Sequence, residues 1–196
     1  MRRSVTLDTG DSQVSSIVVI EPSRQMQLLL RAMLLSYGIR SVRMFADTER
    51  ASSSILNDPP RLVLLDWEAG PNSGANFLKL IRHKNMYPVC LVPIIVMFSE
   101  ARRCWVEKAL RLGGQGVLVK PMSPAALLDR IKWVLNGAST LSLRGDRYVI
   151  EGMDVRLEDE RDKQEQLKTV REYEKSQLAE LANIQNDIDK ILHSSF

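Results

Sequence analysis

Short apolar runs alternate with amphipathic segments five times between residues 17 and 137. The runs are four or five residues long and rich in valine, isoleucine and leucine, which is typical of strands buried on both faces of a parallel sheet. We expect strands at Ile17–Ile20, Val42–Phe45, Leu62–Leu65, Ile94–Phe98 and Gly116–Val119.

The amphipathic segments between the runs predict helices, because their apolar residues recur at helical spacing. Asp47 and Ser123 are suited to cap a helix N-terminus, and Gly38 and Gly113 stand just past helix ends, where a left-handed residue is favoured. The expected helices are Ser23–Tyr37, Thr48–Leu56, Ala75–Ile81, Arg102–Leu112 and Pro124–Leu135. Five βα units predict an α/β fold with a doubly wound parallel sheet covered by helices on both faces.

Charged residues follow three of the predicted strands. Glu21 comes after the first strand, Asp66 and Glu68 after the third, and Lys120 after the fifth. Ligands of such folds gather at the carboxyl ends of the strands, so these residues together predict a site for a cation or a phosphoryl group. Taken singly, Glu21 could cap the next helix and Lys120 could extend its ammonium group to water.

The composition is that of an ordinary globular protein, with 44% apolar and 26% charged residues. No apolar run is long enough to span a membrane, and no signal peptide is evident at the start. Cys90 and Cys104 are expected to be reduced thiols in a cytoplasmic protein, and His83 and His193 are too isolated for a zinc site.

The net charge of +3 is unevenly distributed along the chain. Residues 1–136 hold 18 lysines and arginines against 11 acidic residues, a net charge of +7, and residues 137–196 hold 9 against 13, a net charge of −4. The basic residues are scattered rather than clustered with aromatic ones. This indicates a solvated basic surface, and nucleic acid is not an expected partner.

An ordered set of motifs resembles the receiver domain of bacterial two-component response regulators over residues 16–137. The sequence LVLLD ending at Asp66, with Gly74 and FLKLIR ending at Arg82, resembles the phosphoacceptor strand and the helix after it. The matching motifs farther along the chain are Pro93–Met97, Ala109–Gly113 and Val117–Pro121.

This resemblance implies a flavodoxin-like fold and transfer of a phosphoryl group to Asp66 from a histidine kinase or phosphotransfer protein. Lys120 would contact the phosphoryl oxygens. Magnesium would be held by Glu21, Asp66 and the backbone carbonyl of Glu68. The protein would not be an independent enzyme; its only catalysis would be the phosphoryl transfer and autodephosphorylation of a receiver.

Three departures from the family pattern predict an atypical receiver. Pro22 replaces the second of two adjacent acidic residues, so that magnesium binding is expected to be weak or absent. Phe98 occupies the place of the hydroxyl residue that contacts the phosphoryl group, and Ser99 would reach that place only through a one-residue bulge. Val117 replaces the aromatic residue of the switch. Asp66 is thus either a working phosphoacceptor or a vestige of one.

The segments outside the receiver are predicted to be an arm at residues 1–15, a linker at 138–153 and one long helix at 154–196. The helical segment contains neither glycine nor proline. A heptad seam indicates a coiled coil with a polar layer at Glu174 and Gln177, and a single amphipathic helix packed on its own receiver is the alternative. The apolar seam residues are Leu167, Val170, Leu181, Ile184, Ile188 and Ile191.

The leading functional hypothesis is a signalling protein whose output is association through the C-terminal helix, either as a homodimer or with another coiled-coil protein. The alternative is a transcription or antitermination regulator whose nucleic-acid-binding module is absent from this chain or cryptic in it. The acidic tail and the lack of a helix-turn-helix pattern disfavour that alternative. An independent enzyme is disfavoured because no nucleophile–base pair or glycine-rich phosphate loop is present.

Overall fold

The computed structural model describes residues 16–69, 73–137 and 139–193; the side chains of residues 73, 173 and 177–193 are not described. The predicted arm at residues 1–15 lies outside the described residues. The chain divides into two compact units, Met1–Met153 and Asp154–Phe196. We consider each unit by itself.

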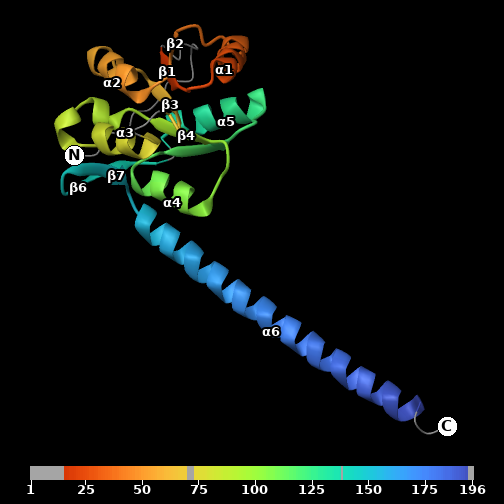
Figure 1. Cartoon of the computed structure of the whole chain (residues 1–196). Helices are drawn as coiled ribbons and strands as arrows, with labels where there is room; N and C mark the ends of the chain where they lie inside the picture. Colours follow the sequence, from red (N-terminus) through yellow and green to blue (C-terminus); the bar gives the residue numbers. More distant parts are fainter. Residues whose placement is uncertain (1–15, 70–72, 138, 194–196) are drawn as a thin grey trace. The chain divides into compact units, whose positions relative to one another are not determined.

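The first unit is built on a sheet of five parallel strands in the order β2-β1-β3-β4-β5 (Figure 1). All five strands fall where the apolar runs predicted them, and the third extends one residue further, to the candidate acceptor Asp66. Their bounds are β1 Ile17–Ile20, β2 Val42–Phe45, β3 Leu62–Asp66, β4 Ile94–Phe98 and β5 Gly116–Val119.

The five predicted helices are confirmed, with ends that differ by at most two residues. Ser23, Asp47 and Ser123 cap the helices that follow them, since each side chain accepts a hydrogen bond from the backbone N–H three residues later. The helices are α1 Arg24–Ser36, α2 Thr48–Asn57, α3 Ser73–Ile81, α4 Arg103–Arg111 and α5 Pro124–Leu135, and the short 3-10 turns η1 Lys84–Met86 and η2 Val89–Leu91 lie between α3 and β4.

The helices cover both faces of the sheet and bury a separate apolar core on each. Helices α2, α3 and α4 pack on one face through residues that include Ile55, Leu78 and Ala109. Helices α1 and α5 pack on the other face, where Leu34 and Ile131 are almost completely buried. This arrangement is the predicted doubly wound α/β fold of the flavodoxin type, and it places the carboxyl ends of all five strands at one edge of the sheet.

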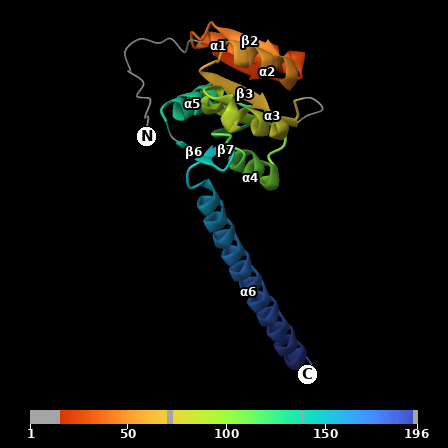
Figure 2. The same ribbon diagram turned by 90° about the vertical axis from the view of Figure 1, so that its left-hand side faces the viewer.

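The segment predicted as a linker, residues 138–153, contains regular structure in its described part. The segment forms an antiparallel hairpin of β6, Leu141–Arg144, and β7, Arg147–Ile150. Gly145, at φ +62°, supplies the left-handed conformation that a two-residue hairpin turn favours. Figures 1 and 2 both show the hairpin beside α4, and Ile150 is 3% exposed. The hairpin is therefore part of the first compact unit.

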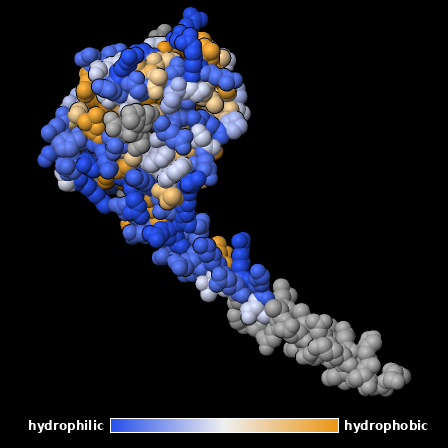
Figure 3. All heavy atoms as spheres, viewed as in Figure 1, coloured by the Kyte–Doolittle hydropathy of each residue, from blue (hydrophilic) through white to orange (hydrophobic). Residues whose placement is uncertain are grey.

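The second unit consists mainly of one long helix, α6, Met153–His193. Of the predicted seam residues, Leu167 and Val170 are 57% and 54% exposed in the single chain. The part of α6 that Figure 3 colours by hydropathy is mostly hydrophilic, with a small apolar patch. The side chains of Leu181, Ile184, Ile188 and Ile191 lie outside the described residues. In the described part of the chain, no helix combines the length and apolar character needed to cross a membrane.

Candidate functional site

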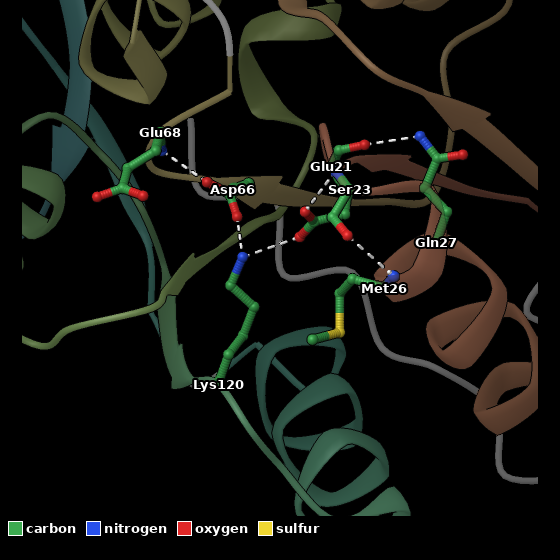
Figure 4. Close-up of polar contacts among 7 residues, drawn as sticks. All are labelled: Glu21, Ser23, Met26, Gln27, Asp66, Glu68 and Lys120. Atoms are coloured by element: carbon green, nitrogen blue, oxygen red, sulfur yellow. Dashed lines mark hydrogen bonds and ion pairs between the residues drawn. The ribbon is translucent and has the colours of Figure 1, made fainter.

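The carboxyl ends of three strands bring one cation and two carboxylates into direct contact. Lys120, directly after β5, donates hydrogen bonds from its Nζ atom to Asp66 Oδ2 at the end of β3 and to Glu21 Oε2 directly after β1, the latter at 2.9 Å (Figure 4). Glu21 and Asp66 are each 2% exposed. Topology thus places the three residues together although 99 positions separate Glu21 from Lys120 along the chain.

Backbone N–H groups hold the carboxylate oxygens that Lys120 does not contact. The N–H of Glu68 donates to Asp66 Oδ1 at 2.6 Å, and the N–H of Ser23 donates to Glu21 Oε1 at 3.0 Å. The side chain of Gln27 in α1 donates to the backbone carbonyl of Glu21 at 2.6 Å. Both carboxylates are therefore fixed in orientation before any ligand arrives.

Burial and hydrogen bonding act in opposite directions on the charges of this site. Burial raises the pKa of Glu21, and the hydrogen bonds from Lys120 and Ser23 offset only part of that increase. Burial lowers the pKa of Lys120, but the hydrogen bonds to Asp66 and Glu21 outweigh it and leave the pKa above its usual value. Lys120 is therefore a cation at neutral pH, and burial makes the ionised form of Glu21 costly.

An aromatic residue ends strand β4, where the family pattern has a hydroxyl residue. Phe98 is 1% exposed, and its ring centroid lies 5.3 Å from that of Trp67. Strand β4 pairs with β5 without interruption up to Phe98 and Val119, so the described pairing has no bulge that moves Ser99 into the strand. Ser99 is exposed and follows the strand. The structure therefore leaves Phe98, and not Ser99, at the end of β4, where the family pattern has the hydroxyl residue that contacts the phosphoryl group.

The other two departures also have defined places. Pro22 is exposed and separates Glu21 from the N-cap of α1, so the chain has no second carboxylate at this point. Val117 is half-buried and packs against the core that contains Phe98. The side chain of Glu68 is exposed, and its contact with Asp66 is made by the backbone.

The donor set for magnesium is small. Among the described residues, no group of three or more histidine, cysteine, aspartate and glutamate side chains is arranged to hold a metal ion. The side chains available are the carboxylates of Glu21 and Asp66, and an oxygen of each already accepts a hydrogen bond from Lys120. Magnesium prefers six oxygen ligands, so water and backbone carbonyls would have to supply most of them. Glu21 and Asp66 are therefore the described side chains that could hold the ion, and Lys120 is bonded to both.

Residues 17–132 match the family model of the response regulator receiver domain. The chain belongs to this family. Receiver domains are signalling modules of two-component systems, which interact with histidine kinases or phosphotransfer proteins and typically bind magnesium. The receiver of this chain accordingly occupies the first compact unit.

Individual relatives agree with this assignment. The phosphate regulon transcriptional regulatory protein PhoB of Klebsiella pneumoniae is 27% identical over 128 residues, which cover 65% of this chain and 54% of PhoB. The chemotaxis protein CheY1 of Helicobacter pylori is 24% identical over 61% of this chain and 95% of its own. The receiver thus spans about half of the PhoB relatives and nearly all of CheY1.

A solved structure supports the same fold. The receiver domain of the sensor histidine kinase PA1611 from Pseudomonas aeruginosa, which has a magnesium ion coordinated in its active-site cleft, superposes with a TM-score of 0.56 at 26% identity. The match covers 61% of this chain and 96% of that domain.

Sequence reasoning missed the residues that orient the predicted site. Gln27 had no signal, because a glutamine inside an amphipathic helix is ordinarily a solvated residue. The contact of Trp67 with Phe98 depends on the packing of two adjacent strand ends. The backbone contacts from Ser23 and Glu68 follow from local turns rather than from any motif.

Proposed function

We propose that this receiver accepts a phosphoryl group on Asp66 in a two-component signalling pathway, and that its site is an atypical one. The observation that carries the proposal is the contact of Lys120 with both buried carboxylates. Phosphorylation replaces the single negative charge of the Asp66 carboxylate with about two on the phosphoryl group, and Lys120 would contact the nearest phosphoryl oxygen.

The transfer itself would proceed from a phosphohistidine of a kinase or phosphotransfer protein. An oxygen of the Asp66 carboxylate attacks phosphorus, the phosphorus–nitrogen bond breaks, and the histidine leaves as a neutral imidazole once it holds a proton. Catalysis of such a step is mainly positioning and charge stabilisation. Here Glu68 N–H and Lys120 fix the carboxylate of Asp66. Magnesium, when bound beside Glu21 and Asp66, would offset the charge of the phosphoryl oxygens.

The site is atypical because it lacks a second carboxylate beside Glu21 and a hydroxyl group at the end of β4. With Pro22 beside Glu21, magnesium would have few charged ligands. With Phe98 at the end of β4, no hydroxyl group stands at the position from which the family's phosphoryl contact is made. We therefore propose that phosphorylation is slow or strongly dependent on magnesium concentration, and that Lys120 provides most of the positive charge.

Peptide mapping tests the acceptor assignment. After incubation with a small-molecule phosphodonor and magnesium, borohydride reduction converts an aspartyl phosphate to homoserine, which marks its position in a peptide. We expect the mark at Asp66 in the wild-type protein and no marked peptide in Asp66→Asn. A mark on another residue would show that the acceptor is misassigned.

We further propose that the output is association through α6, most simply as a parallel pair of α6 helices in a homodimer. Leu167 and Val170 support this proposal because both are more than half exposed in the single chain, on a helix whose other described side chains are largely charged. An isolated helix with this composition gains little from its own sequence, so a second apolar surface would stabilise it.

Light scattering of full-length variants tests this output. Leu167→Asp and Val170→Asp should each weaken the dimer, whereas Thr169→Asp adds the same charge off the predicted seam and should leave it intact. Equal effects of all three substitutions, or a monomeric wild-type protein, would contradict self-pairing. PhoB is named as a transcriptional regulatory protein, but the match covers only about half of it, so the nucleic-acid alternative gains no support from this chain.

A further inference from the structure

A hairpin that lies beyond the matched family region is bonded to the end of helix α3. The N–H of Tyr148 in β7 donates to the backbone carbonyl of Arg82, and the N–H of Lys84 donates to the carbonyl of Asp146, both at 2.8 Å. Between these bonds His83 and Arg147 form an antiparallel bridge. The chain after α3 thus pairs with β7 through one isolated bridge and two flanking backbone hydrogen bonds.

The side chain of Arg82 is buried at this junction. It is 1% exposed, and all five of its described side-chain hydrogen bonds go to neutral oxygens. The acceptors are the backbone carbonyls of Cys90 at 2.7 Å, Val92 at 2.8 Å and Gly113 at 2.9 and 3.0 Å, and Gln115 Oε1 at 3.2 Å. Burial lowers the pKa of Arg82 to about 9, which leaves it a cation at neutral pH.

The hairpin is bonded to Arg82 on one strand and to the loop between α4 and β5 at its entry. Gln115, which accepts from Arg82, also donates to the carbonyl of Ser139 at the entry to β6, at 3.3 Å. Tyr148, on the other strand, is bonded to the backbone of Arg82. Arg82 therefore takes part in this attachment twice, through its backbone carbonyl to Tyr148 and through its side chain to Gly113 and Gln115.

Gly113 shows how close this packing is. A Cβ atom there would lie 2.9 Å from Arg82 Nε and 3.0 Å from the carbonyl oxygen of Tyr148, and its φ of +89° already favours glycine. The α4–β5 loop and β7 are thus packed too closely at this point to accept a side chain at residue 113. A displacement of the loop must move the hairpin or break the bonds of Arg82.

We infer that the hairpin is a latch that couples the α4–β5 side of the receiver to the start of α6. Helix α6 begins at Met153, three residues after β7 ends. A change in the α4–β5 loop would loosen or shift the hairpin and with it the residues that lead into α6. The inference rests on the proposed role of α6 as the output, but its mechanical part, coupling between loop and hairpin, can be measured separately.

Hydrogen exchange of the full-length protein, followed by mass spectrometry, tests the coupling. Tyr148→Pro removes the N–H that bonds to Arg82 and leaves the receiver core unchanged, whereas Tyr148→Ala keeps that N–H and serves as its control. In Tyr148→Pro we expect about tenfold faster exchange in residues 139–150 and also around Gly113–Gly116, with strands β1 and β3 unchanged. Arg82→Met removes the side-chain bonds to the α4–β5 loop, so it should accelerate exchange in the same two segments.

Faster exchange of the hairpin with an unchanged α4–β5 loop in Tyr148→Pro would overturn the latch, whatever Arg82→Met does. If Arg82→Met loosens every strand equally, Arg82 serves core stability, and Tyr148→Pro alone decides. Arg50→Met is the matched control for the arginine, because that side chain is 84% exposed. Neither readout involves Asp66 or helix pairing, so failure of the proposed function leaves this result interpretable.

Discussion

Removing the charge of Lys120 should destabilise the receiver in a way that depends on pH. Lys120→Met retains most of the volume and leaves Glu21 and Asp66 as two neighbouring carboxylates, with side chains only 2% and 3% exposed. Loss of one partner from a buried ion pair costs about 3–5 kcal/mol. The site can limit this cost by keeping a proton on Glu21.

The cost of protonating Glu21 sets the expected loss of unfolding free energy. Holding a carboxyl group with a usual pKa of 4.5 in its protonated form at pH 7 costs about 3.4 kcal/mol, because each pH unit is worth about 1.4 kcal/mol. We therefore expect Lys120→Met to lower the free energy of unfolding by about 3 kcal/mol at pH 7, a fall in melting temperature of roughly 6–12 °C. In the substituted protein Glu21 has a folded-state pKa raised far above its unfolded value. The variant therefore loses stability as pH rises. Its free energy of unfolding approaches that of the wild type by about 1.4 kcal/mol per pH unit as pH falls toward 5.5.

Urea unfolding of the full chain at pH 5.5, 7 and 8 measures this effect. Lys79→Met, on the exposed side of α3, is the matched control and should change little at any pH. In a Glu21→Gln background only one carboxylate remains, so Lys120→Met should lose most of its pH dependence. A deficit below about 1 kcal/mol at pH 7, or one of equal size at all three pH values, would refute the argument that Lys120 neutralises two buried charges.

Three further predictions concern the same site. Glu21→Gln alone should slightly stabilise the receiver at pH 7, because burial raises the pKa of Glu21 and makes its ionised form costly. This gain in stability should vanish as pH falls through that pKa, and a loss of stability at pH 7 would contradict the prediction. Phe98→Ala should cost about 3–5 kcal/mol in urea unfolding as a fully buried ring is lost, whereas Ser99→Ala, in an exposed position, should cost less than about 0.5 kcal/mol. Magnesium, titrated against Trp67 fluorescence with Trp67→Phe as the blank, should saturate only at concentrations well above those needed by a receiver with two adjacent acidic residues; tight saturation would show that the carboxylate missing at residue 22 is dispensable.

The strands and the convergence of the site were predictable because one physical constraint governs both. Strands buried on both faces are apolar along most of their length, as in β4 and in Leu62–Leu65 of β3, and a parallel sheet then places the residues at the ends of its strands at one edge. Glu21, Asp66 and Lys120 needed no further information to be grouped.

The missed features depend on contacts that no local pattern records. The hairpin has two four-residue strands with polar and charged positions, LSLR and RYVI, and its only turn signal is Gly145-Asp146. Arg82 belongs to a recognisable motif, but an arginine is ordinarily exposed. Its burial depends on oxygen acceptors of four other residues that are distant in the sequence. Whether Ser99 enters the strand was likewise decided by the β4–β5 register.

The central claim, that Asp66 is a phosphoacceptor served by Lys120, is tested most directly by the intact mass of the full-length protein after incubation with a small-molecule phosphodonor and magnesium. The account predicts the added mass of one phosphoryl group on the wild type, increasing with magnesium concentration, and none on Asp66→Asn. Lys120→Met should show a much smaller fraction of modified protein. An unmodified wild type at high magnesium, or a modified Asp66→Asn, would contradict the account.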